Sequence, residues 1–335
     1  MSPIRMAQIG TKHGHAAGKL SSMQRHPDVE LIGVYEPDVA HRRTLQHDAR
    51  WQGVTWLDEM ERILDDGSIV AVASEGLNVE SLAHTEALVR AGKHVWYDKP
   101  AGEDWPRWQA VVEDAREREL VIQMGFMFRY HDGFRRIAEW VQTQSLGHVF
   151  AVRAHMSTQI TPAQREVIGV HRGGIYYDLS GHMLDQIVWL LGRPDRVSPF
   201  MRHDDGDIVP GFVDNALVVY EYDRQPRGAM AFVDIAAMEP SPMARRFEVY
   251  GTLGSAILEP FEPAEQIRLC LQEASAGFSA GVHMVPIVRQ SRQDLYDLEL
   301  AAFLSVLRGE RPPDRTLDHE LLVQETILRS TGMLR

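Results

Sequence analysis

The stretch that decides the fold is residues 4–36, which read IRMAQIGTKHGHAAGKLSSMQRHPDVELIGVYE. Apolar runs over 4–9 and 29–35 predict two strands, and a helical pattern that begins at Ala16 lies between them. Gly10 follows the first strand and Glu36 ends the second. This order is typical of a dinucleotide-binding βαβ unit, in which phosphates meet the helix N-terminus and the acid holds a ribose diol.

The glycine turn of this unit departs from the pattern G-x-G-x-x-G. Six residues form the turn, and we expect them to contact the cofactor: Gly10, Thr11, Lys12, His13, Gly14 and His15. Lys12 and His15 stand where the second and third glycines belong. Lys12 either contacts a phosphate by its charge or blocks close approach of the pyrophosphate, and the sequence leaves both alternatives open. We interpret His13 and His15 as loop histidines and predict no metal, because two histidines at i and i+2 show no third ligand.

Glu36 also bears on the choice between the two nicotinamide cofactors. A carboxylate at this position pairs with a free ribose diol and repels a 2′-phosphate, so NAD is the expected cofactor. Arg42 and Arg43 lie about two helical turns further on and could reach a phosphate. NADP therefore stays open as the alternative.

Composition indicates a two-domain protein of the cytoplasm. A chain of 335 residues is long enough for two cores. The single cysteine, Cys270, excludes an internal disulfide and suits a reducing compartment. The net charge of −12, without any basic cluster, argues against nucleic acid or an anionic membrane as partner. No signal-peptide pattern and no uninterrupted apolar stretch of about 18 residues is present.

Strands and helices alternate up to about residue 127. We expect strands at 4–9, 29–35, 69–74, 93–97 and 121–125, and helices beginning at 16 and spanning 79–91 and 105–118. Such alternation predicts a parallel sheet with helices on both faces. The fold class is therefore α/β over residues 1–127, a dinucleotide-binding Rossmann domain.

The regular alternation of strands and helices ends in residues 128–335. We expect these residues to form an α+β domain for substrate binding and oligomerisation. Helices are predicted at 133–142 and 177–191, with a strand at 148–156 between them. Strands at 216–222, 229–235, 246–250, 256–259 and 267–272 follow with short turns, which indicates a mostly antiparallel sheet. Helices at 294–308 and 319–329 end the chain and can pack back on the first domain.

A charged residue ends one of the predicted buried strands. Residues 92–100 read GKHVWYDKP, so Lys99 lies between an apolar run and a proline. The alternative is a surface lysine, but a buried ammonium without a function would be costly. Lysine, histidine and aspartate can together hold and deprotonate a hydroxyl group but cannot accept a hydride. The electron acceptor must then be a cofactor.

A second polar cluster interrupts the apolar helix predicted at 177–191. Asp178 and His182 are four residues apart and so share one helix face, with Asp185 three residues further along. A carboxylate one turn from an imidazole can fix its tautomer or hold a substrate hydroxyl beside it. The alternative is a pair that only satisfies its own hydrogen bonds. The two glycines before the helix and the separate Lys99 favour a functional pair.

Together these segments resemble the glucose-fructose oxidoreductase and inositol dehydrogenase (Gfo/Idh/MocA) family. Residues 91–100 are similar to its A-G-K-H-V-x-x-E-K-P segment, with Asp98 in place of glutamate. Residues 173–185 resemble its glycine-initiated D-x-x-x-H-x-x-D helix, and residues 251–255 resemble its G-T-x-G-S turn. The resemblance covers nearly the whole chain. It implies a Rossmann domain followed by a domain with an open-faced sheet, and NAD or NADP as cofactor.

The resemblance also implies roles for single residues. Lys99 would contact cofactor and substrate and bind the reacting hydroxyl oxygen, His182 would take or return its proton, and Asp178 would orient the substrate or the histidine. Hydride would pass to C4 of the nicotinamide. Further residues are implied in binding, Asn78 for the cofactor and Arg129, Tyr130 and Tyr177 for the substrate, where aromatic rings suit a sugar face.

Three functions are consistent with these residues. The first is an NAD-dependent dehydrogenase of a secondary alcohol in a sugar, a sugar derivative or an inositol-like polyol. The second is an enzyme with permanently bound NAD that oxidises a sugar transiently for lyase, epimerase or glycosidase-type chemistry. The third is a non-catalytic sensor of sugar or dinucleotide. Alternating segments such as residues 217–220 predict an apolar sheet face that a homodimer or homotetramer would cover.

Overall fold

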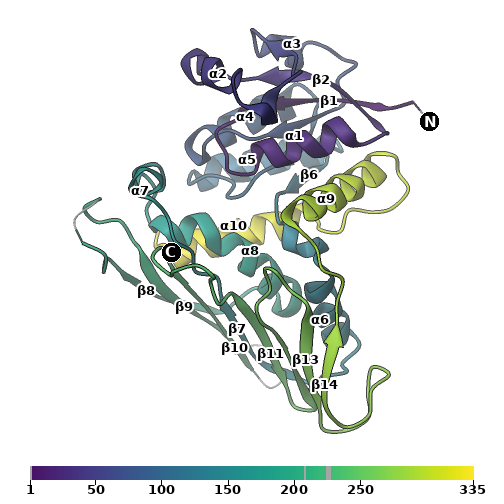
Figure 1. The fold of residues 1–335 in the computed structure, drawn as a ribbon, viewed down its shortest axis with the longest axis vertical. Helices are drawn as coiled ribbons and strands as arrows, with labels where there is room; N and C mark the ends of the chain where they lie inside the picture. Colours follow the sequence, from purple (N-terminus) through teal and green to yellow (C-terminus); the bar gives the residue numbers. More distant parts are fainter. Residues whose placement is uncertain (1, 207–208, 224–227) are drawn as a thin grey trace. The chain divides into compact units, whose positions relative to one another are not determined.

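The computed structural model describes residues 2–206, 209–223 and 228–335, which group into two compact units (Figure 1). The first unit is Met1–Phe126 with Arg292–Leu321, and the second is Met127–Ser291 with Leu322–Arg335. The first unit is therefore built from two segments that are far apart in the sequence. Among the helices of the described residues, none combines the length and the hydropathy needed to cross a bilayer.

A six-stranded parallel sheet forms the centre of the first unit, as predicted. The strand order is β3-β2-β1-β4-β5-β6, which is the doubly wound Rossmann order. The strands are β1 (Ile4–Ile9), β2 (Val29–Tyr35), β3 (Trp56–Leu57), β4 (Ala71–Ser74), β5 (His94–Tyr97) and β6 (Ile122–Met124). The order reverses between β1 and β4, and ligands of such sheets bind at the carboxyl ends of the strands beside this point.

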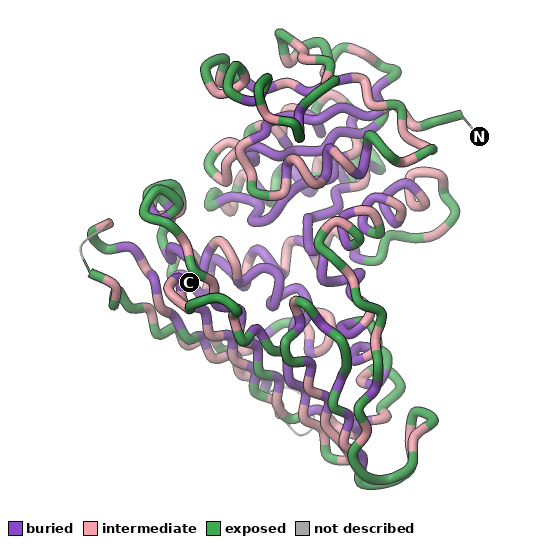
Figure 2. Tube along the Cα trace, in the orientation of Figure 1, coloured by how far each residue is buried: buried purple, intermediate pink, exposed green. Residues whose placement is uncertain are grey.

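The helices of the first unit cover this sheet. They are α1 (Ala16–Arg25), α2 (Val39–Leu45), α3 (Glu61–Leu64), α4 (Asn78–Arg90), α5 (Trp105–Glu117) and α9 (Arg292–Leu307), with a 3-10 turn η1 (Ala49–Trp51). Burial explains the apolar runs of the sequence, since β4 is wholly buried and β1 is buried over its last four residues (Figure 2). The sequence did not predict β3, which has only two residues.

Helix α9 packs on α1 although the two helices lie far apart in the sequence. A Cβ atom at Gly18 would lie 2.5 Å from Cε2 of Tyr296, so only glycine allows this approach. The Gln293 amide donates to the Gly18 carbonyl at 3.1 Å, and Arg25 pairs with Asp297 at 2.9 Å. The late segment is therefore an integral part of the first unit.

The second unit contains an eight-stranded sheet, mostly antiparallel as predicted. Its order is β14-β13-β12-β11-β7-β10-β9-β8, and β7 with β10 is the parallel pair. The strands are β7 (Val149–His155), β8 (Arg196–Arg202), β9 (Asn215–Tyr222), β10 (Ala229–Ala236), β11 (Arg246–Gly251), β12 (Gly254–Leu258), β13 (Gln266–Leu271) and β14 (Gly281–Pro286). The helices are α6 (Asp132–Gln142), α7 (Pro162–Ile168), α8 (Gly174–Leu191) and the larger part of α10 (Leu317–Ser330), with a 3-10 turn η2 (Met127–Tyr130).

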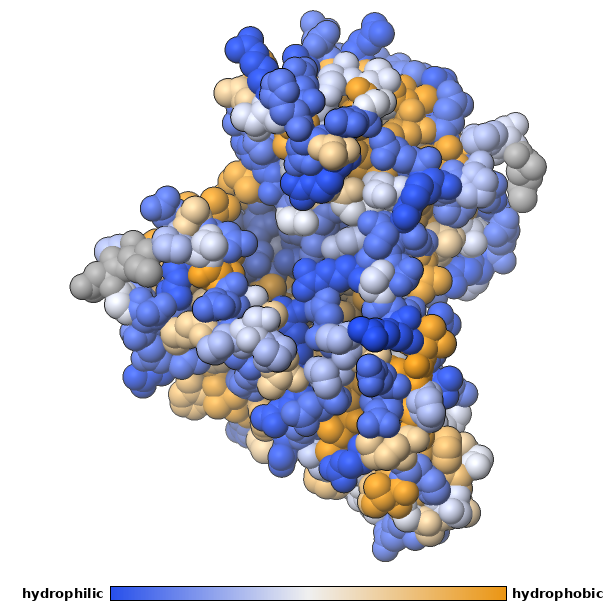
Figure 3. All heavy atoms as spheres, in the orientation of Figure 1, coloured by the Kyte–Doolittle hydropathy of each residue, from blue (hydrophilic) through white to orange (hydrophobic). Residues whose placement is uncertain are grey.

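Helix α8 covers one face of this sheet. The Tyr176 hydroxyl on α8 lies 2.5 Å from the Tyr220 hydroxyl on β9, which is 2.8 Å from the Ser330 hydroxyl on α10. The opposite face carries Leu217 and Met230, which are 38% and 51% exposed. Apolar patches interrupt the polar surface over the strands of this unit (Figure 3). The register therefore separates a buried face from an open one.

Candidate functional site

The turn between β1 and α1 is shaped by two glycines with different surroundings. Gly10 has a φ of +80°, and a Cβ there would lie 2.4 Å from the Gly76 backbone nitrogen. This position therefore requires glycine. A Cβ at Gly14, in contrast, would meet no heavy atom within 4 Å. The turn is tightly fixed at its start and open at Gly14.

Glu36 lies directly after β2, as predicted, and is 2% exposed. Its Oε2 accepts a hydrogen bond from the Thr11 hydroxyl at 2.5 Å, and its Oε1 accepts one from the Asp38 backbone amide at 2.9 Å. These bonds hold the carboxylate between the turn after β1 and the start of α2. A carboxylate at this place is typical of sites that bind the ribose of a dinucleotide.

Lys12 lies in the open part of the turn and connects it to two helix starts. Its Nζ is 3.2 Å from Asp38 at the N-cap of α2 and 3.5 Å from Glu80 in the first turn of α4. Partial burial alone would lower the pKa of Lys12, but the hydrogen bond to Asp38 and the charge of Glu80 raise it above its ordinary value. Lys12 is therefore a firmly protonated cation within the turn between β1 and α1.

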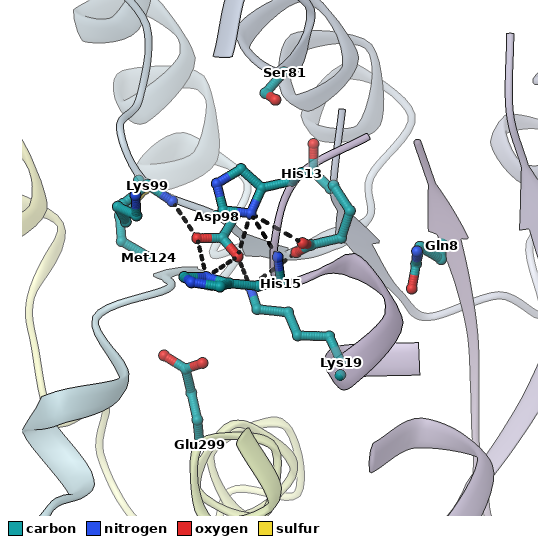
Figure 4. Close-up of polar contacts among 12 residues, drawn as sticks. Gln8, His13, His15, Lys19, Ser81, Asp98, Lys99, Met124 and Glu299 are labelled. Carbon is teal, nitrogen blue, oxygen red and sulfur yellow. Dashed lines mark hydrogen bonds and ion pairs between the residues drawn. The ribbon is translucent and has the colours of Figure 1, made fainter. Parts of the chain in front are cut away.

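A buried charged cluster surrounds Asp98 at the end of β5 (Figure 4). The Asp98 Oδ2 atom lies 3.2 Å from His13 Nδ1, 3.0 Å from His15 Nδ1 and 3.2 Å from Lys19 Nζ. Lys19 also pairs with Glu75, which follows β4, at 2.9 Å. Asp98, Lys19 and Glu75 are at most 2% exposed. The predicted loop histidines are half-buried and contact this network, and Asp98 completes a group of three candidate metal ligands.

Burial and charge pull the pKa values of this cluster in opposite directions. Burial lowers the pKa of His15 to about 4, against the opposing charge of Asp98. Burial alone would raise the pKa of Asp98, but His13, His15 and Lys19 hold it well below its ordinary range. Burial raises the pKa of Glu299 on α9 to about 7. Groups with such shifts are typical of functional sites.

Lys99 follows Asp98 and is only 3% exposed, so it is not a surface lysine. Its backbone amide donates to Asp98 Oδ1 at 2.8 Å. Asn78, the other cofactor residue expected outside the turn, is the first residue of α4. Lys99, Glu36 and Asn78 follow β5, β2 and β4 respectively, and carboxyl ends of parallel strands meet at one edge of the sheet.

In the second unit, α8 carries Asp178 and His182, the predicted carboxylate and imidazole of the site. His182 is buried and packs edge-on against Phe128, with ring centroids 5.2 Å apart. Asp178 lies one turn earlier on α8 and is half-buried. The four-residue spacing puts both side chains on the same face of the helix. The geometry therefore permits the predicted pairing of a carboxylate with an imidazole.

Arg129 binds Asp185, which lies on the next turn of α8 after His182. Its guanidinium contacts both carboxylate oxygens of Asp185, at 2.5 and 3.1 Å, and lies 3.9 Å from the Trp189 ring centroid. These contacts fix α8 against η2. Tyr130 is 5% exposed, and Tyr177 is fully buried and stacks on His171 at 4.8 Å. The substrate contacts expected of Arg129, Tyr130 and Tyr177 stay predictions.

The sequence analysis missed Lys19, the buried ion-pair partner of Asp98, and two buried carboxyl groups whose pKa values respond to Asp98, namely Glu75 and Glu299. One signal for Lys19 was present: it shares the spacing of Ala16, Leu20 and Met23, the apolar residues on the buried face of α1. No comparable local signal marks Glu299, because its place depends on how α9 packs.

The first unit fits a dinucleotide. Gly14 leaves open space at the turn, and Glu36 presents a fixed carboxylate at the end of β2. Residues 4–126 match a family described as an oxidoreductase family with an NAD-binding Rossmann fold, and residues 134–257 match the GFO/IDH/MocA C-terminal domain. Fold and matches define an NAD(P)-binding oxidoreductase. The chain belongs to the Gfo/Idh/MocA family.

Relatives and solved structures extend this similarity over nearly the whole chain. The scyllo-inositol 2-dehydrogenase (NAD(+)) of Bacillus subtilis is 25% identical, over 98% of this chain and 95% of its own. UDP-N-acetylglucosamine 3-dehydrogenase GnnA from Acidithiobacillus ferrooxidans has a TM-score of 0.80 at 18% identity, covering 100% of this chain and 98% of that one. GenD2 from gentamicin A biosynthesis, solved in complex with NAD, has a TM-score of 0.79 at 21% identity, with 99% and 95% covered.

Proposed function

We propose that the protein is an NAD-dependent oxidoreductase that transfers a hydride between a secondary alcohol and nicotinamide. The substrate class is a sugar, a sugar derivative or an inositol-like cyclic polyol. The observation that carries the proposal is the buried Lys99 at the end of β5, on the same sheet edge as the Glu36 carboxylate. The inositol and sugar dehydrogenases among the similar proteins support this substrate class.

The proposed chemistry assigns a separate task to each polar residue. The bound nicotinamide would supply the hydride acceptor. Lys99 would place its ammonium beside the reacting oxygen and stabilise the negative charge that develops there. His182 would remove or return the hydroxyl proton, and Asp178 would orient the imidazole or hold a second hydroxyl. A base and a cation are both needed because an alcohol has a pKa near that of water, about 16.

The preference for NAD over NADP is proposed from Glu36. The Thr11 hydroxyl and the Asp38 amide hold the carboxylate in place. It therefore could not turn away from the 2′-phosphate of NADP and would repel it. Hydrogen bonds to a charged group contribute about 1.5–3 kcal/mol, so Glu36→Ala should weaken NAD binding by about tenfold or more. NADP binding should weaken less or improve.

Three measurements test the proposal. Denaturing purified protein and identifying any released dinucleotide by mass spectrometry would show what it carries. Titrating NAD and NADP into cofactor-free protein and into Glu36→Ala then measures the preference. Tighter binding of NADP by the wild type, or an unchanged ratio in the variant, would contradict the role of Glu36. A screen of polyols and sugars for a change in nicotinamide absorbance tests the reaction.

A second candidate is an enzyme that keeps its dinucleotide bound and oxidises its sugar only transiently. Lys12 favours it, because its bridge to Asp38 and Glu80 ties the phosphate-binding turn to α2 and α4. Such a bridge would slow release of a cofactor bound beneath it. Stoichiometric dinucleotide in the purified protein, without turnover of added cofactor, would support this candidate. Rapid exchange with added NAD would exclude it.

We also propose that the protein assembles as a homodimer or homotetramer through the open face of the second sheet. Leu217, Met230 and Met284 lie on this face and are 38%, 51% and 50% exposed. An apolar face of this kind is a liability in a monomer. Light scattering that shows a monomer at micromolar concentration would contradict the proposal.

A further inference from the structure

We propose that His13, His15 and Asp98 form a binding site for a divalent first-row transition metal ion of the zinc type. The site lies in the first unit, where the turn after β1 meets the end of β5 (Figure 4). It does not depend on the substrate class proposed above, but His13 and His15 also belong to the turn that we expect to contact the cofactor. The two imidazole nitrogens and one carboxylate oxygen lie within 4.8 Å of one another.

Two of the three separations between the ligand atoms match a tetrahedral ion. Zinc binds nitrogen and carboxylate oxygen at about 2.0–2.1 Å, so two ligand atoms on one tetrahedron lie about 3.3 Å apart. The Asp98 Oδ2 atom is 3.2 Å from His13 Nδ1 and 3.0 Å from His15 Nδ1. These two distances are shorter than the tetrahedral edge of about 3.3 Å by only a few tenths of an ångström. The third separation, between the nitrogens of His13 and His15, is within 4.8 Å, so these two side chains set how far the ligands must move to hold an ion.

The contacts of His13 Nδ1 show what a metal ion at this nitrogen would replace. The backbone amide of His15 donates to this nitrogen at 3.2 Å, which requires an unprotonated Nδ1. The same nitrogen faces Asp98 Oδ2 at 3.2 Å, and a hydrogen bond there would require a protonated Nδ1. One nitrogen cannot satisfy both contacts. A metal ion between His13 and Asp98 would take the single lone pair of Nδ1, so the His15 amide would have to give up this acceptor.

The backbone holds the ligands in place before any ion binds. The His13 amide donates to the Glu75 carbonyl at 3.1 Å, and the Asp98 amide donates to the Ser74 carbonyl at 3.2 Å. Both ligands are thus attached to the end of β4. The Lys99 amide fixes Asp98 Oδ1 at 2.8 Å, an outer contact of the kind that orients metal-binding carboxylates.

Lys19 competes with a metal ion for the Oδ2 atom of Asp98. Its Nζ lies 3.2 Å from Asp98 Oδ2, but it is closer to Glu75 Oε1, at 2.9 Å. An incoming ion can therefore take the Asp98 oxygen while the ammonium keeps Glu75 as its partner. If the ion pairs alone explained the cluster, metal would not displace Lys19. The two explanations predict different binding behaviour.

The donor set indicates the class of metal. Two imidazoles and one carboxylate suit zinc and its neighbours, whereas calcium and magnesium prefer oxygen ligands throughout. Three protein ligands leave the fourth position of a tetrahedral ion to water or another oxygen ligand. We expect one ion in each chain.

The experiment is a titration of chelator-treated, full-length protein with Zn²⁺ by calorimetry, and with Co²⁺ by visible absorption. The matched variants are His13→Ala, His15→Ala and Asp98→Asn, with the exposed His47→Ala of the same unit as control. We expect one ion per chain and a tetrahedral Co²⁺ spectrum in the wild type and the control. Losing a ligand should weaken binding by at least the roughly 10–100-fold seen for outer-shell residues.

Thermal melts of each variant, recorded with and without Zn²⁺, separate loss of the site from loss of the fold. The histidine variants decide the test if Asp98→Asn does not fold, since they leave the pairs of Lys19 intact. Binding that survives in both histidine variants, or an absence of stoichiometric uptake by the wild type, would overturn the proposal. A Co²⁺ spectrum of an octahedral, oxygen-ligated ion would overturn it as well.

Discussion

Replacing Arg129 with methionine should destabilise the second unit strongly. Arg129 is 3% exposed and Asp185 is fully buried, and two of their contacts measure 2.5 and 3.1 Å. Removing the guanidinium leaves a buried carboxylate on α8 without its cation. A single partner removed from a buried pair costs about 3–5 kcal/mol.

The lower end of this range applies here, because Asp185 keeps a donor in the Gln186 amide. The Gln186 amide still donates to Asp185 Oδ2 at 2.8 Å in the Arg129→Met variant. We therefore expect a loss of about 3 kcal/mol in the free energy of unfolding. The double variant Arg129→Met/Asp185→Leu should recover most of this loss, because it removes the unpaired charge together with its former partner.

Urea unfolding followed by circular dichroism measures both effects. The exposed pair of Arg50 and Asp48 serves as the control, and Arg50→Met should cost no more than about 1 kcal/mol. A loss below about 1 kcal/mol for Arg129→Met would refute the reasoning, because the buried pair would then behave like an exposed one. A double variant as unstable as the single one would also refute it.

Three further outcomes are expected. Lys99→Ala should lower kcat by on the order of 10²–10³ and His182→Ala by 10²–10⁴, and the double variant should lose less than the product of the two; near wild-type turnover in either single variant would show that the chemistry lies elsewhere. Glu299 has its pKa raised by burial from 4.5 to about 7, so the folded state keeps a proton that the unfolded state loses between these values, and stability should fall as pH rises through this window. Between pH 5 and pH 8, the free energy of unfolding measured by urea titration should fall by about 2.5 kcal/mol less in Glu299→Gln than in the wild type, and parallel pH dependences would contradict the assignment. Met230→Asp on the open sheet face should reduce the mass seen by light scattering, whereas the exposed Leu298→Asp on α9 should leave it unchanged.

The fold could be predicted largely because its buried strands and helices leave periodic patterns in the sequence. The apolar runs at β1, β2, β4 and β5 and the spacing in α8 are of this kind. Elements without a strong pattern were missed. β8 and β14 are edge strands with mostly exposed or half-buried residues, and α7 has one buried residue, Arg165. Their place depends on neighbours that the local sequence does not reveal.

The candidate site was predictable only where a residue stands out against its surroundings. Lys99 ends an apolar run, and His182 interrupts an apolar helix, so both could be identified locally. The network around Asp98 could not, because its members come from the turn after β1, from α1, from the ends of β4 and β5, and from α9. Asp98 stands where the family segment has glutamate. Its contacts with His13 and His15 depend on how the turn after β1 packs beside the end of β5, which the local sequence does not show.

The two-segment construction of the first unit has a consequence for how the protein folds during synthesis. Residues 2–126 leave the ribosome first, but α1 exposes the face that α9 covers until Arg292–Leu307 has been made. At about 5–20 residues per second, this interval lasts roughly 10–40 s. The nascent chain therefore presents the surface around Gly18 to chaperones for that time, and a fragment that stops at residue 126 would present it permanently.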